Sequence, residues 1–236
     1  MSLKTRFGNL GNILDFDNLT EENIYVLDSP ILTNSQFKKF KKFFSKKTKT
    51  IDCTFNISSS LKERIEEIRE EAETSVRQGS TCIVLSDKNI TDQNASIPSI
   101  LTVGAVHSHL VKHGLRGYCS LNVECSDALD THSFAVLIGV GATTVNPYLA
   151  IDSIYQRFEK KLFGKSDFES CVLKFKKSID AGLLKIMSKM GISVISSYRG
   201  GCNFEAVGLS RAIVSDYFPG MSSRISGIGV IGIEKK

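Results

Sequence analysis

The sequence predicts an α/β protein built as an incomplete (β/α)-barrel-like parallel sheet with an N-terminal arm. From Ile51 onward, short apolar runs alternate with longer segments of helical period, which is the pattern of repeated βα units. Hydrophobic residues make up 42% of the chain and charged residues 23%, a composition that supports a packed core. The length of 236 residues suits one large domain, because cores divide only beyond roughly 250 residues.

Residues 1–50 differ in pattern from residues 51–236 and are predicted to form an arm that packs on this βα-repeat body. The arm contains a lysine-rich helix that begins with a capping box of Thr33 and Gln36. Phenylalanines at helical spacing give the helix one apolar face, and lysines fill the remainder. These residues are Phe37, Phe40 and Phe44, with Lys38, Lys39, Lys41, Lys42, Lys46, Lys47 and Lys49 around them. The pattern favours a helix that buries its phenylalanines and solvates its lysines.

The first part of the body is predicted to hold three βα units and a fourth strand. The first helix has a capping box of Ser60 and Glu63, an apolar stripe, and Gly79 as its end. β-branched and apolar runs between the helices indicate the strands. The expected strands cover 51–55, 81–85, 119–123 and 143–146, and the expected helices cover 60–79, 98–113 and 127–138.

The second part of the body is predicted to be mainly helical. A capping box of Ser166 and Glu169 introduces a long helix that ends at Gly191. A fifth strand is expected at 192–197, directly before the glycine pair Gly200-Gly201. Further elements are expected as helices at 151–163 and 210–218 and a strand within 225–233.

Charge and cysteine usage indicate an intracellular protein. Thirty Lys+Arg against 25 Asp+Glu give a formal charge of +5, and the six cysteines form no C-x-x-C pair. The cysteines are therefore expected to be buried thiols in a reducing compartment. The longest apolar stretch, Phe134 to Ala142, is far shorter than the ~20 residues of a membrane span. We expect a cytoplasmic protein with no membrane or nucleic-acid partner.

Polar residues follow several predicted strands at the edge where α/β sheets place their working groups. Asp87, Glu124 and Asn146 occupy such positions, as does the segment 197–200 after the expected fifth strand. Asp87 and Glu124 are candidate acid/base partners. Strands of α/β domains commonly end in polar loops, so a purely structural role stays open.

Three histidines fall on one predicted helix, and spacing separates them. His109 and His113 share a face at i, i+4 and are able to chelate a metal, whereas His107 points away. No carboxylate or cysteine lies nearby in sequence to complete a site, so no metal is predicted. The amides of Gly200-Gly201 are an alternative cradle for an anion beside Arg199, although a tight turn explains the glycines equally well.

A series of ordered motifs runs along nearly the whole chain, from about residue 8 to residue 229. The motifs are the segments 28–34, 84–87, 105–110, 146–150, 189–193, 197–200 and 204–209, with the strongest near the C-terminal end. In the same order, these motifs closely resemble the large subunit of glutamate synthase. No Ser-His-Asp order or P-loop competes with this resemblance.

The resemblance is to the family's central domain. In that family it lies between the glutaminase domain and the FMN/iron-sulfur barrel, and it borders the tunnel that carries ammonia between them. It implies an oxidoreductase of ammonia assimilation as parent, with FMN and an iron-sulfur cluster in the neighbouring domains. For this chain it implies no catalytic residue and no cofactor. Ser108, Ser133 and the pair Cys202-Asn203 depart from the family's usual residues.

The same resemblance identifies candidates for the interface or the tunnel. They are Tyr198, Arg199, Gly200, Gly201 and Glu205. Arg199 is expected to find its partner in a neighbouring domain and to have none within this chain. Two alternatives remain beside the central-domain hypothesis. One is a freestanding (β/α)-barrel enzyme with its site at the strand ends, and the other is a basic binding module that uses the lysine-rich helix.

Overall fold

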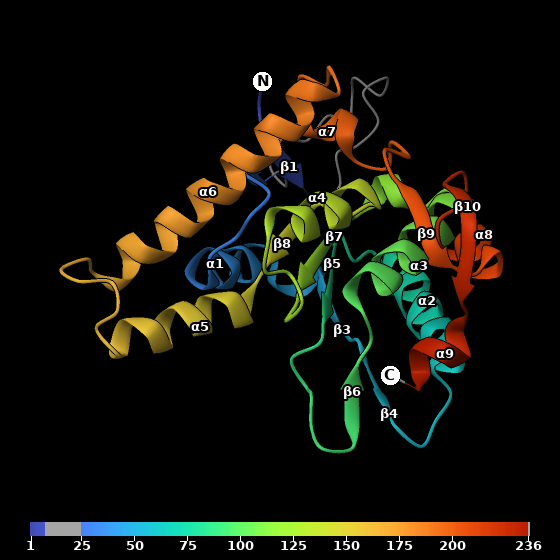
Figure 1. Ribbon diagram of the computed structural model, residues 1–236. Helices are drawn as coiled ribbons and strands as arrows, with labels where there is room; N and C mark the ends of the chain where they lie inside the picture. The colour runs from blue at the N-terminus through green and yellow to red at the C-terminus, as the bar shows by residue number, and fades with distance from the viewer. Residues whose placement is uncertain (8–24, 236) are drawn as a thin grey trace.

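A four-stranded parallel sheet forms the centre of the protein, whose computed structural model describes residues 1–7 and 25–235 (Figure 1). The strand order follows the chain, and each strand pairs with the next without a skip. The sheet does not close, so the predicted incomplete barrel is confirmed. Its strands are β3 Thr48–Asp52, β5 Cys82–Ser86, β7 Ser120–Glu124 and β8 Thr144–Asn146.

Three helices connect these strands and pack on one face of the sheet, as the predicted βα units require. The first of them begins at Ser60, whose Oγ accepts a hydrogen bond from the Glu63 amide at 3.4 Å. This half of the capping box satisfies one of the free amides of the first turn. The helices are α2 Leu61–Arg77, α3 Ser99–Lys112 and α4 Thr131–Gly139.

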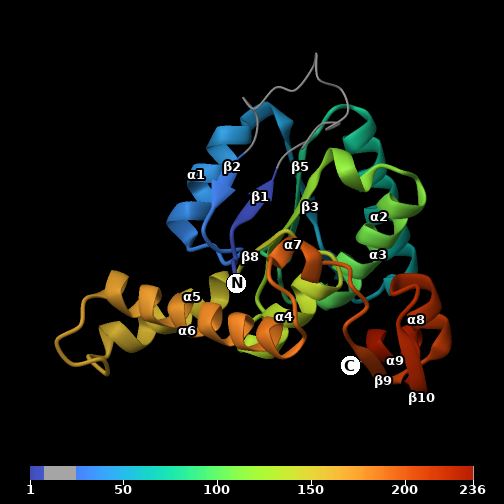
Figure 2. The same cartoon turned by 90° about the horizontal axis from the view of Figure 1, so that it is seen from above.

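Strand β5 is buried on both faces, and its alternating side chains separate two hydrophobic clusters. Ile83 and Leu85 belong to the main core with α2 and α3, whereas Cys82 and Val84 belong to a smaller cluster with α1. Figure 2 shows α1 and α2 on opposite sides of this strand. The continuous apolar run therefore reflects helices on both faces of the sheet.

The lysine-rich helix is present as α1 Asn34–Phe44, with both halves of the Thr33–Gln36 capping box. Phe37, Phe40 and Phe44 are buried against the sheet, as their spacing predicts. Strand β3 begins at Thr48, so the sheet crosses the boundary placed at residue 50. Residues 8–24 of the predicted arm lie outside the described residues. Short strands β1 Thr5–Phe7 and β2 Tyr25–Leu27 pair antiparallel beside α1.

Two long helices form a hairpin that projects from the body (Figure 1). They are α5 Tyr148–Glu159 and α6 Phe168–Lys189. The predicted capping box of Ser166 and Glu169 is wrong. The N-cap is Asp167, whose Oδ1 accepts from the Ser170 amide at 2.8 Å, and a carboxylate also suits the positive end of the helix dipole.

The expected fifth strand at 192–197 is wrong. Only Val194 makes a strand-like bridge, to Ser2, and a short helix α7 Ile195–Tyr198 follows it. The β-branched residues there do not extend the sheet beyond β8, because residues 30–32 already bond to the outer side of that strand. Two short strands, β4 Thr54–Asn56 and β6 Asn94–Ser96, pair antiparallel and form a protruding ribbon. The C-terminal elements form a separate layer. They are β9 Glu205–Leu209, α8 Arg211–Tyr217, β10 Ser222–Ile228 and α9 Val230–Glu234.

Within residues 1–7 and 25–235, no helix is long and apolar enough to cross a bilayer. The long helix α6 is amphipathic, with lysines along its length and a buried stripe that includes Ile179 and Leu183. Its apolar face packs on the body of the protein.

The α1 helix offers a direct test of its packing role. Phe40→Ala should destabilise the fold by about 3 to 5 kcal/mol, because its ring is fully buried between the helix and the sheet. The exposed Lys39→Ala, one residue away, should change stability by less than about 0.5 kcal/mol. Urea unfolding of both variants measures the difference. Equal stabilities would show that the phenylalanine face does not support the fold.

Candidate functional site

Three predicted strand-end residues come together at the carboxyl edge of the sheet. Asp87 follows β5, Glu124 ends β7, and Asn146 ends β8, the next strand in the sheet. All three side chains are buried. The structure thus brings these three strand-end candidates together, because parallel strands deliver their last residues to one end of the sheet.

Asp87 holds two loops in place. Its Oδ2 accepts hydrogen bonds from the Ser126 amide at 3.0 Å, the Ser126 hydroxyl at 2.6 Å and the Ser96 hydroxyl at 3.1 Å. Burial raises the pKa of the nearby Tyr148 hydroxyl, and the Asp87 carboxylate adds to the rise. The aspartate is thus engaged by donors from its own chain.

Glu124 and Asn146 are engaged in the same way. Glu124 accepts from the Ser86 hydroxyl at 2.8 Å and pairs with the Lys88 ammonium at 3.0 Å. Asn146 donates to the Leu32 carbonyl and to Asn34 Oδ1, both at 3.0 Å. A general base needs an oxygen that reaches substrate. Glu124 uses both of its oxygens on Ser86 and Lys88, and the one unpartnered carboxylate oxygen, Asp87 Oδ1, is buried. The cluster braces the strand ends.

The segment 198–201 lies at the opposite edge of the sheet from Asp87 and Glu124. It contacts the turn Gly139–Ala142, which precedes β8 and therefore sits at the amino ends of the strands. The Gly200 amide donates to the Gly139 carbonyl at 2.8 Å, and Arg199 Nε donates to the Ala142 carbonyl at 3.1 Å. The prediction of one shared polar edge is wrong, because the strand that would have delivered this segment does not form.

Two expectations for this loop are corrected. Arg199 has a partner within its own chain, the Ala142 carbonyl, so it braces the loop. Burial lowers the pKa of Arg199 to about 10, and the charge of Arg116 adds to the effect. The glycine amides form no anion cradle, because the Gly200 amide bonds to Gly139 and the Gly201 amide to Tyr198 at 3.4 Å. Gly200 adopts φ 69°, which explains the glycine as a turn residue.

Arg116 links the elements beneath this loop, and sequence reasoning missed it. Its guanidinium donates to His107 Nδ1 at 3.1 Å, the Cys119 carbonyl at 2.6 Å and the Gly141 carbonyl at 2.9 Å. A fourth contact, from the same nitrogen that donates to Gly141, reaches Thr143 Oγ1 at 3.2 Å. Burial, followed by the charges of Arg116 and Arg199, lowers the pKa of His107 to about 4. His107 therefore stays neutral and accepts from Arg116 at neutral pH.

A cleft of about 490 Å³ opens beside this network. His107, Gly139, Gly200 and Cys202 line one part of it, and α8 with the residues after it lines another. Glu205 lies nearby on β9 and contacts the exposed Arg224 at 3.5 Å. The cleft joins the loop candidates to the C-terminal layer of the protein.

The cysteines are mostly unsuited to nucleophilic chemistry. All six are free thiols, and five are buried, as predicted, while Cys202 is exposed. Burial raises the pKa of Cys53 and of Cys82 to about 12 and also raises those of Cys119 and Cys125. A thiol with a raised pKa is not the thiolate that attacks substrate.

The structure also assembles a group that the sequence left incomplete. Glu73 on α2 lies against His109 and His113 on α3, with ligand atoms of all three within 4.8 Å of one another. The carboxylate comes from the preceding βα unit, so no local spacing reveals it. From the sequence, only the expected packing of the two successive helices α2 and α3 could have suggested that Glu73 lies near the histidines.

Known proteins match this chain along its length. Residues 1–210 match the family described as the glutamate synthase central domain. The NADPH glutamate synthase large chain of Azospirillum brasilense is 54% identical over 239 residues, which cover 100% of this chain and 16% of that protein. That of Bacillus subtilis is 41% identical over 86% of this chain, and the ferredoxin-dependent enzyme 1 of Arabidopsis thaliana is 37% identical over 97%. This chain spans 13% and 15% of those two proteins.

Among solved structures, the flavin-binding domain of baker's yeast flavocytochrome b2 aligns with a TM-score of 0.45 and 15% identity. The alignment covers 89% of this chain and 48% of that domain. These values are too low to bear on function. The family match and the three relatives agree with the ordered motifs of the sequence. The chain belongs to the glutamate synthase family and corresponds to its central domain.

Proposed function

We propose that this chain is a non-catalytic part of a larger glutamate synthase, in which it links the glutaminase and FMN-binding domains and borders the ammonia tunnel. The observation that carries the proposal is the buried network at the strand ends. Asp87, Glu124 and Asn146 bond to their own chain and the unpartnered Asp87 Oδ1 is buried, where an enzyme of this class would expose a base. The same observation argues against a freestanding barrel enzyme.

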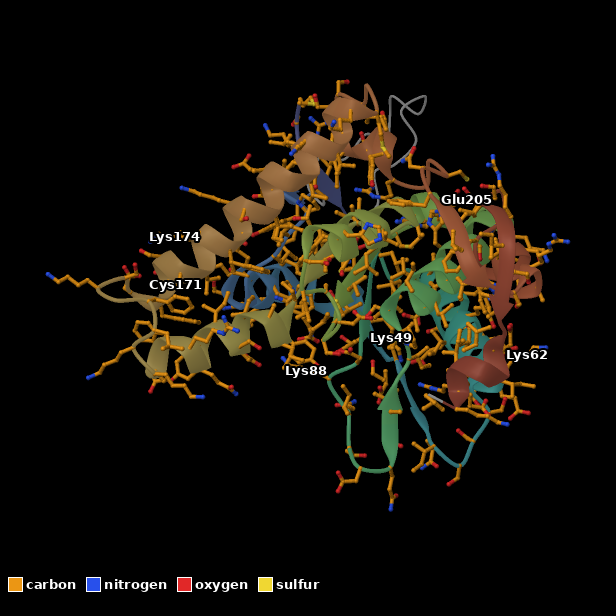
Figure 3. All side chains as sticks on the ribbon, in the orientation of Figure 1. Lys49, Lys62, Lys88, Cys171, Lys174 and Glu205 are labelled. Atoms are coloured by element: carbon orange, nitrogen blue, oxygen red, sulfur yellow. The ribbon has the colours of Figure 1, made fainter. Side chains whose placement is uncertain are left out.

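Exposed apolar side chains support contacts with two neighbours. One set lies on the α5–α6 hairpin and the other on the β9–β10 layer, on opposite sides of the molecule (Figure 1). In Figure 3 the labelled Lys174 on α6 and Glu205 on β9 mark these two opposite sides. The first set is Leu149, Tyr155, Leu162 and Leu173, and the second is Val207 and Ile225 on the two strands with Ile231 on the adjoining helix α9. Apolar groups gathered on a surface mark interaction sites.

In this role the chain works by geometry. The parent enzyme would release ammonia from glutamine at one site and add it to 2-oxoglutarate at another, with flavin and iron-sulfur chemistry supplied by the neighbouring domains. Ammonia that escapes between the sites is lost, so their alignment determines how efficiently the two reactions couple. A parallel sheet held at both edges by internal bonds gives the neighbours a rigid spacer.

The first prediction concerns the isolated chain. Purified protein should fold, bind no FMN after incubation and desalting, and release no ammonia from glutamine above a blank. The physical reason is that its strand-end groups are already bonded and its buried thiols have raised pKa values. Absorbance in the flavin region and an ammonia assay measure both. A stoichiometric yellow chromophore or glutaminase turnover would contradict the proposal.

The second prediction concerns the two apolar surfaces in the full-length enzyme. Leu162 and Val207 are 66% and 64% exposed, so Leu162→Lys and Val207→Lys should leave the stability of this domain nearly unchanged. Each should nonetheless disturb an interface and lower, at least twofold, the glutamate formed from 2-oxoglutarate per glutamine hydrolysed. The exposed Lys174→Gln on α6 serves as the control and should keep the wild-type ratio.

Free ammonia should rise in the two lysine variants by the amount that glutamate formation falls. Unchanged coupling in both variants would show that these surfaces face solvent in the enzyme. Loss of coupling in the Lys174→Gln control as well would show a general effect of changing the hairpin, and the interface assignment would then fail.

A further inference from the structure

We propose that Glu73, His109 and His113 form a binding site for a divalent late first-row transition ion, with Zn²⁺ as the probe. The glutamate lies on α2 and both histidines lie on α3. Their ligand atoms lie within 4.8 Å of one another. This site is independent of the proposed linking function and of the strand-end cluster.

The distances are close to those of a metal site. Glu73 Oε2 lies 2.6 Å from His109 Nε2 and 3.8 Å from His113 Nδ1. Two neighbouring ligands of a tetrahedral Zn²⁺, each about 2.0–2.1 Å from the ion, are about 3.3 Å apart. Because His113 Nδ1 is hydrogen-bonded to the His109 carbonyl, His113 would coordinate through Nε2. Glu73 Oε2 and His109 Nε2 are closer than two ligands of one ion, so these two groups would move apart by less than about 1 Å to admit it.

The ligands are held by rigid elements and by further bonds. Arg77 Nε donates to Glu73 Oε1 at 2.8 Å, so the second oxygen, Oε2, is the one that faces the histidines. His113 Nδ1 lies 2.9 Å from the His109 carbonyl, a contact of the kind that orients ligating histidines through their second nitrogen. Buried Arg69 joins α2 to α3 by donating to the Ala105 carbonyl at 3.3 Å. The two helices thus present the three groups together.

An ion explains why both imidazoles approach one carboxylate. The ring centroids of His109 and His113 are 4.3 Å apart. The other oxygen of this carboxylate already pairs with Arg77, so two imidazoles gather beside a group that one ion pair already engages. A metal ion keeps both imidazoles neutral and uses a lone pair from each.

The ligand set defines which ions fit. Two imidazoles and one carboxylate suit Zn²⁺, Co²⁺, Ni²⁺ or Cu²⁺, whereas Mg²⁺ and Ca²⁺ prefer all-oxygen sites. Three protein ligands leave a fourth position for water, and exposed His113 leaves that position open to solvent. His109 also lines the 490 Å³ cleft, so the ion would sit at its rim and fasten α2 to α3 there.

The test uses the whole chain, stripped with a chelator and titrated with Zn²⁺ against a chromophoric indicator. One equivalent should bind, and His113→Asn and Glu73→Gln should each weaken binding at least tenfold. His113 is exposed, so its variant should keep the metal-free melting temperature. His132→Asn changes another exposed histidine, and Cys202→Ser removes the exposed thiol, and both should bind Zn²⁺ as the parent does.

Co²⁺ substitution identifies the ligands. Visible ligand-field bands without a thiolate charge-transfer band are expected in the parent and should vanish in His113→Asn. Mg²⁺ at the same concentration should not compete. The proposal is overturned if no equivalent of Zn²⁺ binds, if binding survives in His113→Asn, or if Cys202→Ser or His132→Asn abolishes it.

Discussion

Arg116 carries a guanidinium whose N–H groups must find acceptors once the surrounding elements exclude water. It finds them on α3, before β7 and in the turn before β8, through His107, Cys119 and Gly141. Leaving such a group without partners costs several kcal/mol, on the order of 3 to 5 for a buried charge. These elements therefore have little freedom relative to one another. Arg199 adds the loop after α7 to the same turn through the Ala142 carbonyl.

Different groups hold the two ends of the parallel strands. At the amino ends, guanidinium groups donate to backbone carbonyls, and at the carboxyl ends, buried carboxylates accept from hydroxyl and ammonium groups. Both arrangements bury the polar groups that an enzyme of this architecture would direct at substrate. These braced strand ends and the two exposed apolar surfaces are the features on which the proposed spacer role rests.

Local patterns predicted most of the fold, and long-range pairing explains the errors. The Thr33–Gln36 and Ser60–Glu63 pairs located two helices because capping depends on neighbouring residues alone. The segment 192–197 has strand-like residues, yet residues 30–32 occupy the outer side of β8, and no local pattern records that. The same limit separated Arg199 from its acceptor Ala142 and Glu73 from His109, since each pair joins distant parts of the sequence.

The central claim is that the strand-end carboxylates support structure and take no part in chemistry. Glu124→Gln in the full-length enzyme tests this most directly, because it keeps the shape of the side chain and removes its charge. The account predicts an unchanged kcat for glutamate formation once the folded fraction is measured, together with lower stability from the lost Lys88 pair. A general acid or base contributes about 10²- to 10⁴-fold. A loss of that size in a fully folded variant would contradict the account.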